Sequence, residues 1–197
     1  MTVAAAVLAA GRGLRFGPGP PKPLASFAGR PLLAHVVDAV VASGLDPCCC
    51  VVGDPAVAAA VPVGVTVLRN PEPERGIASS LRIVLEHLAA LDGVDAVVVG
   101  LADQPLVGSE AWRRMGAGSA PLAVATYGGV RANPVRIARS LWGEAVALDG
   151  DEGARVLIRR HGAVGVVCDD AGDPADADTP AELAALERRW RSQTASG

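Results

Sequence analysis

The chain contains VAAAVLAAGRGLRFG at residues 3–17, where an apolar run ends abruptly in a glycine-rich loop. A short run of small and β-branched apolar residues bounded by glycine is typical of a strand buried inside a parallel sheet. Further apolar runs alternate with helical patterns, which predicts a single doubly wound, three-layer α/β/α domain with a mostly parallel sheet. The expected strands are 3–8, 48–52, 65–68, 96–101, 122–126, 134–137 and 164–168, and the expected helices are 31–41, 56–60, 79–91, 139–148, 152–160 and 180–190.

Composition restricts the class of protein. Half of the 197 residues are hydrophobic and the formal net charge is -3. This suits one domain, which we place at residues 1–191, followed by a polar tail at 192–197 that we expect to be frayed. A slightly acidic chain lacks the basic face of a nucleic-acid-binding protein. The apolar N-terminus has no basic leader, and no run reaches the roughly 18 apolar residues of a membrane span. We therefore expect a cytoplasmic protein with neither nucleic-acid nor membrane partners.

The four cysteines do not form the pattern of a metal site. Cys48, Cys49 and Cys50 are consecutive in an expected strand, so their side chains alternate between the two faces of the sheet. They also lack the two-residue gaps of a zinc site. We expect these three and Cys168 to be thiols of the core.

The glycine-rich loop is rich in positive charge. Arg12 and Arg15 lie in it, and Lys22 follows as the single lysine in a chain with 17 arginines. A dinucleotide fingerprint would continue into a helix whose N-terminus holds the pyrophosphate, but here Pro18-Gly19-Pro20-Pro21 follows the loop. Free backbone N–H groups beside several cations suit a triphosphate better. An NAD(P)-dependent oxidoreductase remains the alternative from another class.

Carboxylates occur where an open α/β sheet binds its ligands. Asp103 follows the most buried expected strand, at the carboxyl edge of the sheet. Asp176 and Asp178 precede the last expected helix. Capping of a turn or helix would explain any one of them alone. Together they suit a hard divalent cation, Mg²⁺ or Mn²⁺, of the kind that neutralises phosphates during nucleotidyl transfer.

These motifs resemble those of the MobA-like NTP transferases and sugar-phosphate nucleotidyltransferases, over nearly the whole chain from Val3 to Leu186. The resemblance rests on Leu8-Ala9-Ala10-Gly11, Arg15-Phe16-Gly17, Lys22-Pro23-Leu24 and Asp103-Gln104-Pro105. It implies a nucleotide-diphospho-sugar transferase-like, Rossmann-like fold. It also implies that Arg15, Lys22 and Asp103 are catalytic, and that Asp103 and Asp178 hold the metal with Asp176 in reserve. Gly13 departs from the family, where many relatives have serine.

The resemblance also indicates the nucleotide site, formed by the loop and by a segment that closes over base and ribose. The residues expected to bind nucleotide are Leu8, Ala9, Ala10, Gly11, Arg12, Gly13, Arg15, Lys22, Asn70, Gly76, Ser79, Ser80 and Asp103. For Ser79 or Ser80 a helix N-cap is the alternative interpretation, and both roles can coexist.

Within the family, Leu-Ala-Ala-Gly, Ser-Ser-Leu and Asp-Gln-Pro are similar to the molybdenum cofactor cytidylyltransferase branch. This implies transfer of CMP from CTP to molybdopterin, with a molybdoenzyme or its maturation chaperone as a protein partner. The residues expected to bind the acceptor are Arg131, Asn133, Asp151 and Arg155, where Asn133 replaces the histidine of relatives. The alternatives are a guanylyl- or other nucleotidyltransferase with a different phosphorylated acceptor, and a nucleotide-binding regulator without catalysis.

Overall fold

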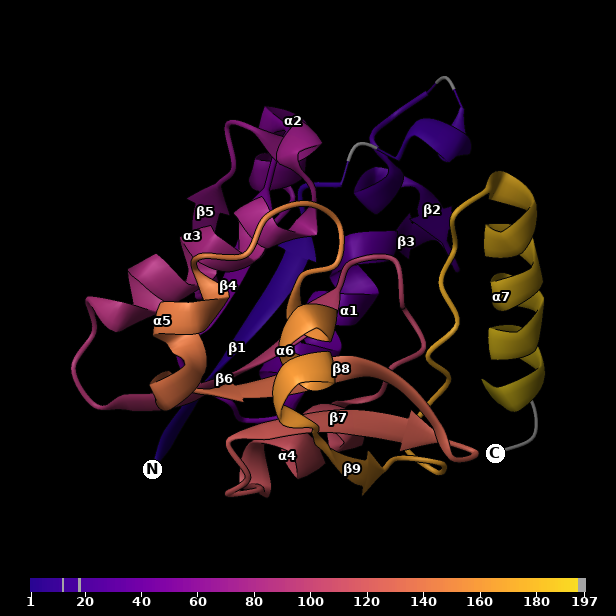
Figure 1. Cartoon of the computed structure of the whole chain (residues 1–197). Coiled ribbons are helices and arrows are strands. Elements are labelled where there is room, and N and C mark those ends of the chain that lie inside the picture. The colour runs from indigo at the N-terminus through magenta and orange to yellow at the C-terminus, as the bar shows by residue number, and fades with distance from the viewer. Residues whose placement is uncertain (12, 18, 195–197) are drawn as a thin grey trace.

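A computed structural model describes residues 1–11, 13–17 and 19–194 of the chain. Its centre is a seven-stranded sheet in the order β5-β4-β1-β6-β8-β7-β9 (Figure 1). The strands are β1 (Thr2–Ala9), β4 (Cys48–Val52), β5 (Thr66–Arg69), β6 (Val94–Leu101), β7 (Leu122–Tyr127), β8 (Val130–Ala138) and β9 (Val164–Val167). β8 runs antiparallel to β6 and β7, whereas the other neighbours are parallel. All seven expected strands and the mostly parallel sheet are confirmed.

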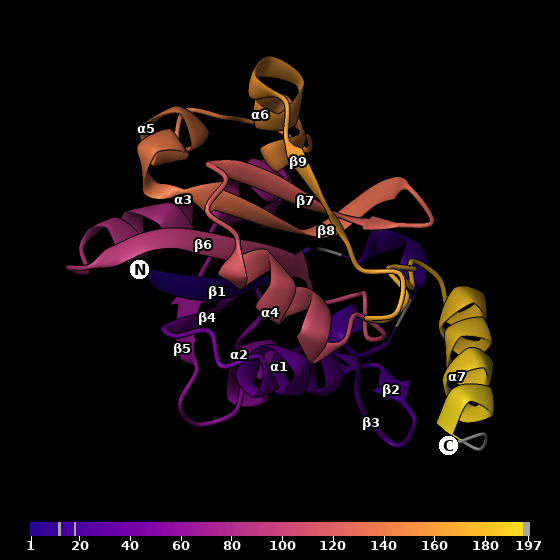
Figure 2. The same cartoon turned by 90° about the horizontal axis from the view of Figure 1, so that it is seen from below.

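Helices cover both faces of the sheet, so the domain has the three predicted layers. They are α1 (Leu32–Ala42), α2 (Pro55–Ala59), α3 (Ile77–Ala89), α4 (Ser109–Ala117), α5 (Trp142–Ala145), α6 (Ala154–His161) and α7 (Pro180–Thr194). Figure 2 shows α3, α5 and α6 on one side of the sheet and α1, α2 and α4 on the other. Cys48 and Cys50 are buried on the α1 side and Cys49 on the α3 side, and all four cysteines are free and buried. The expected alternation of the thiols is therefore confirmed.

Three features differ from the expectations. The helix expected at 139–148 is a 3-10 helix, Arg139–Leu141, followed by the short α5. Backbone bonds span three residues before α5, from Trp142 to Arg139, and after it, from Leu148 to Ala145, so the α-helical part is confined to α5. Helix α4 and the hairpin of β2 (Ser26–Phe27) and β3 (Arg30–Pro31) were not predicted.

The final helix α7 lies beside the β2–β3 hairpin at one end of the domain (Figure 1). Leu183 and Leu186 of α7 pack with Phe27 and Leu32 in a small third core. The helix runs to Thr194, so the first three residues of the expected frayed tail are helical, and residues 195–197 lie outside the described part. Within the described residues, no helix has the length and apolar character needed to cross a bilayer.

Candidate active site

The site begins at the carboxyl ends of two neighbouring parallel strands, β1 and β6. The backbone N–H of Ala102, just after β6, donates to the carbonyl of Leu8 near the end of β1, at 3.1 Å. The glycine-rich loop after β1 and Asp103 after β6 therefore emerge at the same edge of the sheet. This is the edge at which open α/β sheets bind ligands.

Charged side chains from three distant segments meet at this edge. The Nζ atom of Lys22 lies 2.7 Å from Oδ2 of Asp103 and 2.8 Å from Oδ1 of Asp178. A guanidinium nitrogen of Arg15 lies 2.5 Å from the other oxygen of Asp178. The Lys22 side chain is only 9% exposed, whereas Arg15 is 76% exposed. A nearly buried ammonium thus bridges two carboxylates, and Arg15 extends the cluster toward solvent.

The environment keeps Lys22 and Asp178 charged. Burial by itself lowers the pKa of Lys22, but the charges and hydrogen bonds of Asp103 and Asp178 outweigh it and raise the pKa above its ordinary value. The hydrogen bond from Lys22 has the largest effect on the pKa of Asp178 and lowers it. Burial opposes this, but the charges of Lys22 and Arg15 also lower the pKa, so the net shift is downward. At neutral pH the cluster therefore contains an ammonium and an ionised Asp178 carboxylate.

The glycine-rich loop folds back so that Lys22 can reach the carboxylates. It forms two 3-10 helices, Leu14–Phe16 and Lys22–Leu24, in place of the long helix of a dinucleotide site. Gly13 has a φ of 56°, and a Cβ atom there would lie 3.0 Å from Cβ of Lys22. Glycine at this position therefore permits both the left-handed backbone and the close approach of the lysine stem.

A cavity of about 680 Å³ opens beside the charged cluster. Its lining includes the following residues of the expected set: Leu8, Ala9, Ala10, Gly11, Gly13, Arg15, Lys22, Gly76, Ser80, Asp103, Asp151 and Asp178. Its lining also includes Pro73 and Glu74, from the 3-10 helix Pro73–Arg75, and Ile77, the first residue of α3. Arg12 was also expected here, but it lies outside the described residues.

Asn70 and Ser79 lie behind the cavity wall. The side-chain amide of the buried Asn70 donates to the hydroxyls of Ser79 at 2.8 Å and Ser80 at 3.0 Å. Its oxygen accepts from the backbone N–H of Glu72 at 2.9 Å. Helix α3 begins at Ile77 without a side-chain cap, so the N-cap interpretation of the serines is wrong. Asn70 instead fixes the turn that presents Ser80 to the cavity.

The carboxylates have the character of a divalent-cation site. Asp103 and Asp178 already converge on one positive charge, and Oδ1 of Asp103 is buried without a hydrogen-bond partner. Asp176 is exposed and does not line the cavity. No cluster of three or more metal-ligating side chains occurs in the described part of the chain. Two carboxylates suit Mg²⁺ or Mn²⁺, which take their remaining ligands from water and substrate phosphates.

Residues 5–164 match the family model of the MobA-like NTP transferase domain. The chain belongs to the MobA-like NTP transferase family. The bifunctional protein GlmU of Staphylococcus saprophyticus is 36% identical over 104 residues, which are 52% of this chain and 23% of that protein. The matched part therefore covers about a quarter of the length of that curated relative.

Solved structures agree with the family. Rv0371c from Mycobacterium tuberculosis H37Rv is 29% identical with a TM-score of 0.81, over 95% of this chain and 98% of that chain. The complex of Rv0371c with manganese gives 26% identity and a TM-score of 0.78, over 95% and 99% of the two chains. The chain thus has the nucleotide-diphospho-sugar transferase-like fold, in agreement with its membership of the MobA-like NTP transferase family.

The four residues expected to bind the acceptor of this MobA-like transferase are dispersed. Of the four, Asp151 alone lines the cavity, beside Gly76. Asn133 donates to the side-chain oxygen of Gln104 at 3.2 Å, and Arg131 donates to the carbonyl of Ala163 at 3.4 Å. Arg155 is exposed on α6. These contacts do not join the four side chains into one pocket.

Two polar residues of the site were missed. Glu74 lines the cavity, and Gln104 is buried against the segment that carries Asp178. The sequence places Glu74 between Asn70-Pro71 and Gly76, within the expected nucleotide segment, so its position was the available signal. Gln104 adjoins Asp103, but nothing in the sequence indicates where its amide points.

Proposed function

We propose that this MobA-like NTP transferase moves CMP from CTP onto a phosphorylated acceptor, molybdopterin, and releases pyrophosphate. The observation that carries the proposal is the contact of Lys22 with both Asp103 and Asp178 in the lining of a cavity of about 680 Å³. A triphosphate needs cations, and a divalent ion needs carboxylates. The cluster of Arg15, Lys22, Asp103 and Asp178 offers both.

The reaction requires no nucleophile from the protein. A phosphate oxygen of the acceptor attacks the α-phosphorus of CTP, the bond between that phosphorus and the oxygen leading to the β-phosphorus breaks, and pyrophosphate leaves with the bonding electron pair. Positioning and electrostatic stabilisation dominate catalysis of this kind. Arg15 and Lys22 are the side chains that balance the charge developing on pyrophosphate.

Asp103 and Asp178 would hold the divalent ion. When bound, Mg²⁺ or Mn²⁺ supplies charge neutralisation of the triphosphate and polarises the α-phosphate. The buried, unpartnered Oδ1 of Asp103 supports this assignment, because a buried carboxylate oxygen without a donor calls for a cation. The manganese complex of Rv0371c supports a divalent metal for the proteins of this fold.

The choice of CTP and molybdopterin rests on sequence motifs that resemble those of the molybdenum cofactor cytidylyltransferase branch. Leu8-Ala9-Ala10-Gly11 lines the cavity, and Ser79-Ser80-Leu81 begins beside it. We retain Arg131, Asn133, Asp151 and Arg155 as acceptor residues, and a molybdoenzyme or its maturation chaperone as recipient of the cytoplasmic product. Transfer of GMP, or transfer to another phosphorylated acceptor, is the competing assignment within the family.

The test is release of pyrophosphate from each of the four nucleoside triphosphates, with Mg²⁺ or Mn²⁺ and purified molybdopterin. We expect release from CTP that depends on both the metal and molybdopterin. Release from GTP alone would refute the choice of base, and release without molybdopterin would refute the acceptor. Thermal stabilisation by NADH or NADPH, with none by CTP and metal, would refute the whole proposal.

A further inference from the structure

The segment from Cys168 to Asp178, here called the connecting segment, joins β9 to α7 and ends at a proposed metal ligand. It lies along the loop that follows β6. The N–H of Gly108 donates to the carbonyl of Ala171 at 2.9 Å, and the N–H of Ala177 donates to the carbonyl of Asp103 at 3.1 Å. The position of Asp178 relative to Asp103 therefore depends on how these two segments are held together.

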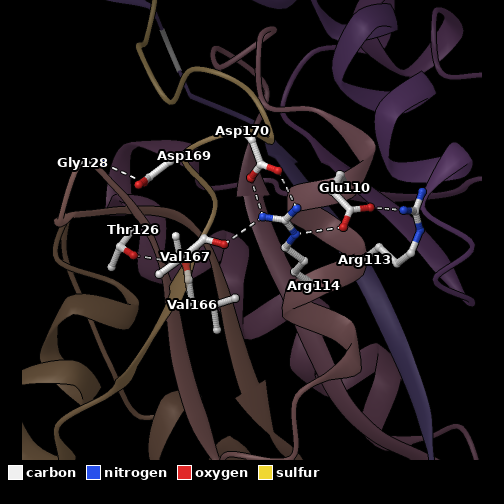
Figure 3. Close-up of polar contacts among 9 residues, drawn as sticks. All are labelled: Glu110, Arg113, Arg114, Thr126, Gly128, Val166, Val167, Asp169 and Asp170. Atoms are coloured by element: carbon white, nitrogen blue, oxygen red, sulfur yellow. Dashed lines mark hydrogen bonds and ion pairs between the residues drawn. The ribbon is translucent and has the colours of Figure 1, made fainter.

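The far end of the connecting segment is fixed at the surface. Figure 3 shows the guanidinium of Arg114, on α4, facing both oxygens of Asp170. The distances are 2.6 and 2.9 Å, and Arg114 also donates to the carbonyl of Val167 at 3.1 Å. Asp169 accepts from the N–H of Gly128 at 2.8 Å (Figure 3). Asp170 is 73% exposed, so solvent screens this ion pair and it contributes little to the stability of the fold.

Besides the backbone bond from Ala177 to Asp103, the near end is held by the buried side chain of Gln104, which is 7% exposed. Its Nε2 atom donates to the carbonyl of Pro174 at 2.7 Å, four residues before Asp178. Its Oε1 atom accepts from the side-chain amide of Asn133, on β8, at 3.2 Å. Asn133 thus determines which way the Gln104 amide faces, and Gln104 in turn holds the connecting segment.

We propose that Gln104 is a positioning residue that sets the distance between the Asp103 and Asp178 carboxylates, and thereby the affinity of the site for a divalent cation. The inference rests on the proposed function, which makes these two carboxylates the metal ligands. Glutamine suits the position because one side chain must accept from Asn133 and donate to Pro174 at once. Groups that orient metal ligands in this way typically change metal affinity by 10- to 100-fold when they are removed.

The test is the affinity of the nucleotide-free, full-length protein for Mn²⁺, measured by electron paramagnetic resonance. Gln104→Met keeps the volume and removes both hydrogen bonds, so we expect Mn²⁺ binding to weaken by roughly 10- to 100-fold. Arg114→Met is the matched control, since it releases the far end only, and its Mn²⁺ affinity should equal that of the wild type. Wild-type Mn²⁺ affinity in Gln104→Met would overturn the inference, even if that variant melts at a lower temperature.

A second variant covers the case in which Gln104→Met fails to fold. Asn133→Asp is nearly isosteric, but its carboxylate accepts where the amide donated, so the Gln104 amide must turn over and set its oxygen against the Pro174 carbonyl. We expect weaker Mn²⁺ binding by a folded protein, and unchanged binding would overturn the inference. Asp103→Asn separates the two proposals. If it binds Mn²⁺ like the wild type, the metal site of the proposed function is wrong; if it loses binding and Gln104→Met does not, the positioning role alone is wrong.

Discussion

Replacing Lys22 by methionine should change metal binding and turnover in opposite directions. The substitution keeps the aliphatic stem and removes the ammonium that lies 2.7 Å from Asp103 and 2.8 Å from Asp178. In the nucleotide-free protein this ammonium occupies the position between the two carboxylates that a divalent ion needs. Removing it frees both carboxylates and removes a repelling charge. Two unit charges 4 Å apart interact by about 1 kcal/mol in water, so a divalent ion gains about 2 kcal/mol, or about thirty-fold in affinity.

Turnover should fall although the metal binds more tightly. If Lys22 stabilises the charge developing on pyrophosphate, its loss costs roughly 10²- to 10³-fold in kcat, the scale of one preorganised electrostatic contact. The affinity for CTP should weaken much less, because Arg15 and the loop amides still bind the triphosphate before the reaction begins. The two assays are Mn²⁺ titration by electron paramagnetic resonance and pyrophosphate release, both at pH 7.5.

Lys22→Arg is the matched control, since it keeps the positive charge. We expect Mn²⁺ affinity close to that of the wild type but impaired turnover, because a planar guanidinium cannot replace a compact ammonium between two carboxylates. Unchanged or weaker Mn²⁺ binding in Lys22→Met would refute the competition between lysine and metal. Wild-type turnover in Lys22→Arg would refute the specific role of the lysine.

Two further predictions concern the cavity wall and the core. In Gly76→Ala the new Cβ would lie 2.5 Å from both Oδ1 of Asp151 and the carbonyl carbon of Gly150, so the affinity for CTP, measured by calorimetry, should fall. Gly29 has a similar positive φ but open space around it, so Gly29→Ala should leave the affinity for CTP unchanged. An equal loss of affinity in both variants would contradict the prediction. Burial raises the pKa of the Cys49 and Cys50 thiols to about 12. Above about pH 8.5 the thiols ionise in the unfolded chain but stay protonated in the folded one, so the free energy of unfolding should fall by about 1.4 kcal/mol per pH unit for each thiol. Urea unfolding between pH 8 and 10 should therefore show a smaller loss for Cys50→Ala than for the wild type, and parallel losses would show that this thiol does not titrate on unfolding.

The sheet could be predicted because its strands are nearly continuous apolar runs, such as Cys48–Val52, which only a sheet covered on both faces would bury. The carboxyl ends of β1 and β6 then had to share an edge, which brought Lys22 and Asp103 within reach of each other. Helix α4 was harder to predict because its sequence, SEAWRRMGA, has a low mean hydropathy and few apolar residues. The helix is buried through Trp112 and Met115, which pack in the core on the α1 side of the sheet.

The acceptor residues show where prediction from sequence stopped. Asn133 was expected to contact an acceptor, and the sequence did not indicate that its amide also donates to Gln104, a partner 29 residues away. The sequence could not decide whether Asp176 or Asp178 is the second metal ligand, because residues two positions apart in an extended segment point to the same side. The hydrogen bond from Ala177 to Asp103 fixes the segment so that Asp178 enters the site and Asp176 stays exposed. Such choices depend on tertiary hydrogen bonds, which no local pattern encodes.

The active-site assignment is tested most directly by the Asp103→Asn variant, through its release of pyrophosphate from CTP in the presence of metal and molybdopterin. This substitution keeps the size of the side chain and removes the charge of the carboxylate that both Lys22 and the metal require. We predict that release is abolished while the circular dichroism spectrum and the cooperative unfolding of the wild type are retained. Near-normal release by this variant would show that the divalent ion is held elsewhere, and would contradict the assignment of the Asp103–Asp178 pair as the centre of the active site.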